Sequence, residues 1–140
     1  MRTQLALTVL SVGLLAACGD PATPSGNAGS RPTPPATSLT ITVSATAKAT
    51  PQRWTLTCDP TGGTLPTAAD ACAFVAKNPA TVLYPVPGHQ TCSMIFGGPQ
   101  VATVQGTWRG KPIDARLART NGCEVARWNT LKPLVGDGGA

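Results

Sequence analysis

Five cysteines constrain what this chain of 140 residues can fold into more than any other feature of its sequence. One of them, Cys18, lies near the start, and the other four follow at Cys58, Cys72, Cys92 and Cys123. In an exported protein an odd cysteine needs a role of its own. If Cys18 has such a role, the other four can form two disulfides, for which three pairings are possible.

The start of the chain has the pattern of a bacterial lipoprotein signal. Arg2 precedes an apolar run, residues 5–15, that is too short to span a bilayer as a stable helix. The sequence Leu-Ala-Ala-Cys at residues 15–18 resembles the lipobox, in which the cysteine thiol receives a diacylglyceryl group. We therefore expect residues 1–17 to be a signal peptide and Cys18 to anchor the exported chain to the outer face of the bacterial cell membrane. An ordinary signal peptide with a chance cysteine is the alternative.

The remaining cysteines would lie in an oxidising compartment after export, so disulfides are expected. Pairing of neighbours along the chain favours Cys58–Cys72 and Cys92–Cys123. The second bridge would close a loop of about thirty residues and contribute roughly 3–4 kcal/mol to stability on the chain-entropy model. These cysteines contain no Cys-x-x-Cys pair, which argues against a zinc site, and we expect no metal.

The composition changes along the chain in a way that indicates one domain on a tether. Residues 18–38 are rich in Pro, Gly, Ser, Thr and Ala and have no apolar periodicity. Such a segment cannot bury enough apolar surface to offset its ordering entropy, so we expect a tether. Residues 39–136 have the length of one small domain, and residues 137–140 read as a flexible tail.

The spacing of apolar residues in the domain predicts an α+β fold. Alternation of apolar and polar residues indicates strands at residues 39–47, 53–58, 101–108 and 113–119. The last two strands would form a hairpin with its turn at Arg109 and Gly110. Other patterns indicate a turn at 59–63, a helix at 65–78, and a helical turn with a last strand within 124–134. We predict a mainly antiparallel sheet with one helix packed on it.

The domain has few side chains that could take part in catalysis, which argues against an enzyme. Catalysis by proton transfer or nucleophilic attack needs titratable groups within mutual reach, and the domain has one histidine, His89, and few carboxylates. It has no Gly-x-Ser-x-Gly motif and no glycine-rich phosphate loop, so we expect no cofactor. The basic residues are scattered rather than interleaved with aromatics, which disfavours a nucleic-acid site. A rigid binding module is the better interpretation.

The stretch QTCSMIFGGPQ, residues 90–100, combines apolar side chains with residues typical of a loop. Met94, Ile95 and Phe96 are followed by Gly-Gly-Pro, which would not usually end a core strand. A loop that fills a partner's pocket needs an exposed apolar side chain and a nearby covalent tie, so that its ordering entropy is lost on folding and not on binding. Cys92 can supply that tie. From the pattern alone, such a loop and a short core strand are about equally good interpretations.

Four stretches of the domain together resemble the Streptomyces subtilisin inhibitor-like family of serine protease inhibitors. They are TLTCDPTGGTLPTAADAC, TCSMIFGGP, VQGTWRGK and RTNGCE, and the resemblance runs from about Leu39 to Leu134. It implies a five-stranded antiparallel sheet with one main helix and a short second helix packed on one face. It also implies two disulfides, between the first two and the last two of the domain's cysteines, and a homodimer.

The resemblance also implies which bond a protease would attack. The reactive bond would join Met94 to Ile95, and Met94 would enter the primary specificity pocket of the protease. Cys92 and Ser93 would form the strand-like approach to that bond. The chain departs from the family at Ser93, where a proline is often found.

Residues on the other side of the bond receive roles in the same way. Phe96 and Gly97 would contact the protease after the reactive bond, and Asn121 would support the loop by side-chain hydrogen bonds. A second departure follows Phe96, because Gly-Gly-Pro at residues 97–99 replaces a shorter and more rigid run.

The sequence therefore predicts a lipid-anchored inhibitor of extracellular serine proteases that acts by a substrate-like standard mechanism. A methionine before the reactive bond favours subtilisin-like or chymotrypsin-like targets over trypsin-like ones. The chain would meet the membrane only through the lipid on Cys18, and it would have no nucleic-acid partner. The alternative function is a non-inhibitory cell-envelope lipoprotein that uses the same fold as an interaction module.

Overall fold

The computed structural model of the chain describes residues 33–138. The predicted signal peptide, Cys18 and most of the predicted tether lie outside the described residues. The first strand begins at Thr37, two residues before the predicted start of the domain. Within residues 33–138, no helix has both the length and the apolar character needed to cross a membrane.

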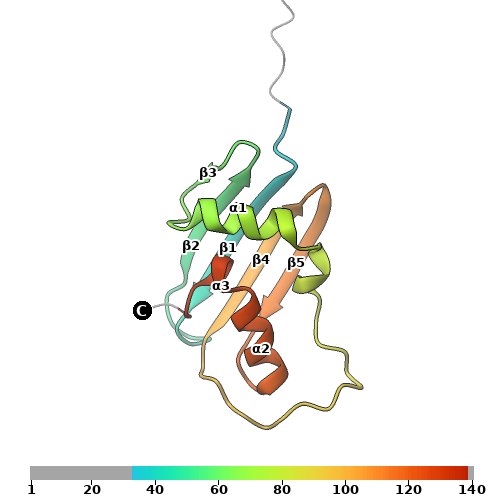
Figure 1. Cartoon of the computed structure of the whole chain (residues 1–140). Helices are drawn as coiled ribbons and strands as arrows, with labels where there is room; N and C mark the ends of the chain where they lie inside the picture. The colour runs from blue at the N-terminus through green and yellow to red at the C-terminus, as the bar shows by residue number, and fades with distance from the viewer. Residues whose placement is uncertain (1–32, 139–140) are drawn as a thin grey trace, which may run out of the picture. The chain divides into compact units, whose positions relative to one another are not determined.

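A five-stranded antiparallel sheet forms the frame of the domain (Figure 1), and this prediction is confirmed. Its strands lie in the order β3-β2-β1-β4-β5. Each long strand alternates buried and more exposed side chains, as a sheet with one covered face requires. The strands are β1 Thr37–Ser44, β2 Gln52–Cys58, β3 Gly62–Gly63, β4 Val101–Trp108 and β5 Lys111–Leu117.

The fifth strand is not the one that the sequence pattern indicated. A turn was expected at residues 59–63, but β3 lies there and pairs with β2. Gly63 has a positive φ of 102°, and a Cβ atom on it would overlap the backbone carbonyl of Thr55. Only glycine allows this close approach, and two glycines give no alternation by which a strand could be recognised.

The end of the chain is helical where a last strand was predicted, so that prediction is wrong. Residues 122–130 form α2 Gly122–Thr130, and α3 Lys132–Val135 follows it directly. The buried side chains of Trp128, Leu131 and Leu134 recur every three residues, which places them on one side of a helix and not of a strand. This spacing was available in the sequence.

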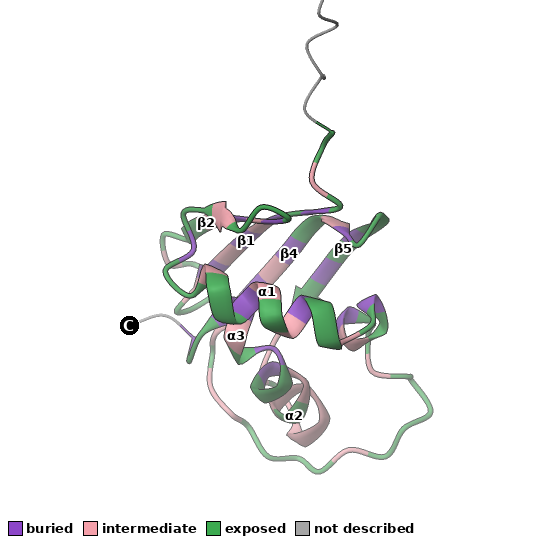
Figure 2. Ribbon diagram, turned by 45° about the horizontal axis from the view of Figure 1, so that its top comes forward, coloured by how far each residue is buried: buried purple, intermediate pink, exposed green. Residues whose placement is uncertain are grey.

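The helices cover one face of the sheet (Figures 1 and 2). The main helix, α1 Ala68–Lys77, lies within the predicted range and starts after Pro66. A short 3-10 helix, η1 Ala80–Leu83, follows it and leads into a long loop. The single core lies between the helices and the sheet, and the rings of Phe74 and the buried Trp108 pack there in a T-shaped arrangement at a centroid distance of 6.1 Å.

The cysteines pair as predicted, in Cys58–Cys72 and Cys92–Cys123. The first bridge joins the end of β2 to α1, and the second joins the long loop to the start of α2. The hairpin of β4 and β5 is also confirmed. Its turn residues Arg109 and Gly110 both have positive φ angles, which match the twist of a two-residue hairpin.

Candidate functional site

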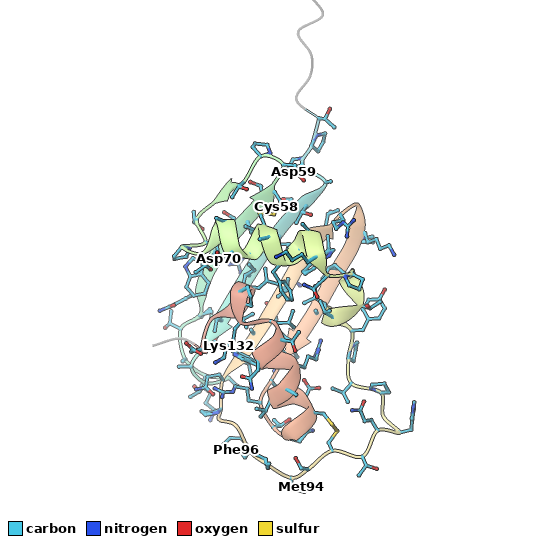
Figure 3. All side chains as sticks on the ribbon, in the orientation of Figure 1. Cys58, Asp59, Asp70, Met94, Phe96 and Lys132 are labelled. Atoms are coloured by element: carbon cyan, nitrogen blue, oxygen red, sulfur yellow. A yellow bond between two sulfur atoms is a disulfide. The ribbon has the colours of Figure 1, made fainter. Side chains whose placement is uncertain are left out.

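A long loop between η1 and β4 carries the exposed apolar residues of the domain. Residues 84–100 contain neither helix nor strand. In Figure 3 the labelled Met94 and Phe96 lie on this loop where it passes beyond the end of α2, away from the sheet. We call residues 92–98 the binding loop.

Three consecutive apolar side chains of the binding loop point into solvent. Met94 is 91% exposed, Ile95 63% and Phe96 64%. The alternative interpretation of these residues as a short core strand is therefore wrong. Only one other large apolar side chain in the described residues is exposed, that of Tyr84. Adjacent exposed apolar side chains of this size are typical of a surface that a partner covers.

The approach side of the binding loop is held by a covalent bond and a hydrogen bond. The Cα atoms of Cys92 and Cys123 lie 5.4 Å apart across their disulfide. The backbone N–H of Gly122 donates to the carbonyl oxygen of Ser93 over 2.9 Å. A Cβ atom on Gly122 would overlap the Ser93 hydroxyl, so a larger residue at the start of α2 would force that hydroxyl to rotate away. The chain is thus fixed at the residue directly before Met94.

The exit side of the binding loop is held by its backbone. The N–H of Gly97 donates to the carbonyl oxygen of Arg119 over 2.7 Å. A Cβ atom on Gly97 would overlap a methyl group of Val125, and Gly98 has a φ of 133° that other residues rarely adopt. Gly97 therefore lets the exit of the loop pack closely against Val125 of α2, so the glycine run does not leave the exit free.

Asn121 supports the loop less directly than the resemblance implied. Its side-chain Oδ1 accepts a hydrogen bond from the backbone N–H of Glu124 over 3.0 Å, which makes Asn121 the N-cap of α2. Among the hydrogen bonds of the described residues, none joins its side chain to the binding loop. Asn121 fixes the first turn of α2, and that turn carries both Gly122 and Cys123.

Arg127 connects α2 with β5 and η1 near the start of the long loop. Its guanidinium is nearly buried and forms an ion pair with Glu124, with 3.1 Å between Nη1 and Oε2. It also donates to the carbonyl oxygens of Arg116 and Leu83, the last residue of η1. One side chain of α2 therefore binds both β5 and the last residue of η1, after which the long loop begins. Sequence reasoning counted Arg127 among scattered surface charges, and nothing in its local pattern marks it as buried.

The arrangement can present a peptide segment, but it brings no set of catalytic groups to that segment. His89 is exposed on the same long loop, and in the described part of the chain no three His, Cys, Asp or Glu side chains are grouped closely enough to hold a metal ion. An extended backbone with exposed side chains, fixed on both sides, can instead enter a groove of another protein as an additional strand.

Comparisons with known proteins agree with this geometry. The profile of a family described as "Subtilisin inhibitor-like", a family of protease inhibitors rather than enzymes, matches residues 33–121. A protein of Streptomyces albogriseolus named "Subtilisin inhibitor" is 37% identical to this chain over 85 residues, which make up 59% of this chain. The chain spans 58% of the length of that relative. The family profile covers most of the described domain, up to the N-cap of α2, and on this match the chain belongs to the subtilisin inhibitor-like family.

Proposed function

We propose that this protein inhibits extracellular serine proteases by presenting the bond between Met94 and Ile95 as a substrate. One observation carries the proposal. Met94, Ile95 and Phe96 are exposed, and the backbone is fixed at Ser93 before them and at Gly97 after them. The family membership and the name of the Streptomyces relative support the same function.

The two fixed points give a physical reason for inhibition rather than digestion. The protease serine would attack the carbonyl carbon of Met94, the bond to the Ile95 nitrogen would break, and the nitrogen would take up a proton and leave as an amine. The acyl group then stays attached through Met94 to Ser93, and the amine stays attached through Phe96 to Gly97. Both ends remain near each other, so the amine can attack the acyl-enzyme again before water does.

The side chain of Met94 would decide which proteases are bound. It is unbranched, flexible and apolar, and it suits a roomy apolar pocket of the subtilisin-like or chymotrypsin-like kind. A trypsin-like pocket, which holds a carboxylate for Arg or Lys, would leave that carboxylate without a partner. Ile95 and Phe96 would contact the protease beyond the reactive bond.

Titration of subtilisin tests this function. The exported chain with Cys18→Ser, which cannot be lipidated, is added in increasing amounts, and the remaining protease activity is measured. The proposal predicts a linear fall to near zero at one chain per protease. Full activity in the presence of excess chain would contradict it and would favour a non-inhibitory envelope lipoprotein.

We further propose that the chain acts at the outer face of the cell membrane, held by lipid on Cys18. The support is the Leu-Ala-Ala-Cys pattern at residues 15–18. Radiolabelled palmitate should enter the wild-type protein in cells and should not enter the Cys18→Ala variant. Equal labelling of the two proteins would refute the anchor.

The family resemblance also leads us to propose a homodimer. The helices cover one face of the sheet, and no described element covers the opposite face, where a second copy could pack (Figures 1 and 2). Sedimentation equilibrium of the Cys18→Ser chain should give twice the mass of one chain. A single-chain mass throughout the concentration range would exclude the dimer.

A further inference from the structure

The side chain of Arg119 lies under the exit of the binding loop. Its guanidinium carbon is 5.8 Å from the ring centre of Trp128, which is completely buried. Its Nη1 donates to Oε1 of Gln100 over 3.4 Å and to the carbonyl oxygen of Asp137 over 3.5 Å. The guanidinium therefore stacks on the ring of Trp128 and also donates hydrogen bonds to two oxygen atoms.

The backbone of Gly97 rests directly on this side chain. A Cβ atom on Gly97 would lie 3.3 Å from both Cβ and Nε of Arg119 and would overlap a methyl group of Val125. Gly97 therefore packs on Arg119 and Val125, and Arg119 packs on Trp128. We call Arg119, Val125 and Trp128 the loop platform.

The loop platform depends on a part of the chain that the family match does not reach. The matched residues end at Asn121, whereas Val125 and Trp128 lie on α2. The Cys92–Cys123 bridge and the Gly122 hydrogen bond hold the approach side, so the platform is the side-chain support of the opposite side. That side carries Ile95, which would become the free amine after cleavage.

We propose that Arg119 is a positioning residue for inhibition, which acts through the loop platform to keep the amine of Ile95 in place so that the cleaved bond is resealed. This inference rests on the proposed function. Only Phe96 separates Ile95 from Gly97 along the chain, so the position of Gly97 limits how far the amine can move. Without the platform the amine of Ile95 would move away from the acyl carbon of Met94, and water would have time to hydrolyse the acyl-enzyme.

The test replaces the guanidinium while keeping the length of its stem. In Arg119→Met we expect the ratio of cleaved to intact inhibitor at equilibrium with catalytic subtilisin to rise about tenfold, the size expected for a lost, partly desolvated cation–π contact. Inhibition should become temporary, with protease activity returning over time. Arg119→Lys should behave in the same way, because a compact ammonium cannot lie flat on Trp128 and also reach both oxygen atoms.

The matched control is Arg53→Met, which removes an exposed arginine of β2. It should leave the equilibrium ratio and the duration of inhibition unchanged. The melting temperature of each variant is measured as well. A merely structural role of Arg119 would lower the melting temperature and leave the ratio of cleaved to intact chain as in the wild type.

A second variant tests the platform from the loop side, in case Arg119→Met does not fold. Gly97→Ala places a methyl group against Val125 and should also make inhibition temporary. Adding Val125→Ala removes the clashing methyl groups and should partly restore lasting inhibition.

The outcomes separate this inference from the proposed function. A wild-type chain that does not inhibit subtilisin contradicts both. A wild-type chain that inhibits, together with folded Arg119→Met and Gly97→Ala variants that inhibit as long as the wild type does, overturns the inference about Arg119 and leaves the proposed function standing.

Discussion

At the scale of single residues, Met94 is the most exposed large apolar side chain among the described residues. Leaving it in water contributes nothing to folding, whereas burying such a side chain in a pocket is favourable by about 1.5–3 kcal/mol. In the proposed complex with a protease, burial of Met94 would therefore contribute free energy to binding and not to folding. Its neighbours Ser93 and Gly97 have the opposite role, because their backbone atoms are bound within the domain.

Shortening Met94 should weaken binding to a subtilisin-like protease without affecting the fold. For Met94→Ala we expect an inhibition constant higher by about tenfold to a hundredfold, which corresponds to the loss of most of the buried side chain. The measurement is a competition assay with a chromogenic substrate. Tyr84→Ala is the control, since it removes an exposed side chain outside the binding loop and should leave the constant unchanged.

Replacing Met94 by lysine should redirect the inhibitor. A lysine can pair with the carboxylate of a trypsin-like pocket, so Met94→Lys should inhibit trypsin while the wild type does not. The assay measures trypsin activity with both proteins at equal concentration. Failure of Met94→Lys to inhibit trypsin, if the variant folds as the wild type does, would mean that Met94 is not the specificity residue.

The exposed loop around Met94 could be predicted in part from the sequence. The pattern Cys-x-Met-Ile-Phe before two glycines indicated a tied apolar loop, and the structure shows its side chains exposed. Arg119 and Gly97 could not be placed in the same way, because the contacts of Gly97 with Arg119 and Val125 join positions more than twenty residues apart and depend on how α2 lies beneath the loop. Burial of a charged side chain has no local signal in the sequence.

At the scale of elements, α2 is the part of the fold that holds the binding loop. It provides Cys123 for the disulfide, Gly122 for the hydrogen bond to Ser93, and Val125 and Trp128 for the loop platform. Its N-cap residue is Asn121. Substitutions that destabilise α2 should therefore also disturb the conformation of the binding loop.

Two substitutions at Asn121 separate capping from direct support of the loop. Asn121→Ala should lower the free energy of unfolding by about 1 kcal/mol, because the N-cap acceptor is lost. Asn121→Asp should retain most of the stability, since a carboxylate accepts the same hydrogen bond near the positive end of the helix dipole. Urea unfolding measures both. If aspartate destabilises the domain as much as alanine, the amide group of Asn121 acts as a donor and not as a cap acceptor.

The two disulfides provide a matched pair of variants. Replacing Cys92 and Cys123 by serine should cost about 3–4 kcal/mol of stability and should turn the chain from an inhibitor into a substrate. Replacing Cys58 and Cys72, which lie 14 residues apart at the other end of the domain, should cost about 3 kcal/mol but leave a folded chain inhibitory. Cleavage by subtilisin is followed by electrophoresis. Equal resistance of both variants would show that the Cys92–Cys123 bridge does not hold the loop.

An ion pair between α3 and the segment that follows it depends on pH. Lys132 Nζ lies 2.7 Å from Oδ1 of Asp137, and this hydrogen bond and the charge of Lys132 hold the pKa of Asp137 below its ordinary value of 3.8. The stabilisation is therefore complete above pH 3.8 and disappears as the pH falls through the lower pKa of the folded state. Both groups are exposed, so the effect is small.

The variant Asp137→Asn should show this pH dependence as a small change in melting temperature. The variant should melt slightly below the wild type at neutral pH, and the difference should vanish well below pH 3.8. A difference that persists in strong acid would mean that the ion pair is not its cause.

At the scale of the whole molecule, the sheet and its helices separate the stable core from the binding loop. The buried residues lie between the sheet and the helices, and the binding loop projects beyond the end of α2 (Figures 2 and 3). The alternation of β1, β2, β4 and β5 was strong enough to predict the sheet. The two-residue strand β3 could not be predicted, because it depends on the close approach of Gly63 to Thr55 and its two glycines give no alternation. The helices α2 and α3 could have been predicted, because Trp128, Leu131 and Leu134 already have helical spacing in the sequence.

We propose above that a protease attacks this chain at one bond, between Met94 and Ile95, and that the protease releases the chain slowly. The most direct measurement incubates the Cys18→Ser chain with a catalytic amount of subtilisin and identifies the cleaved bond by mass spectrometry before and after reduction. We expect a single cut with Ile95 as the new N-terminus, and two fragments that stay joined until the Cys92–Cys123 disulfide is reduced. Rapid cleavage at other bonds, with Met94–Ile95 left intact, would contradict it.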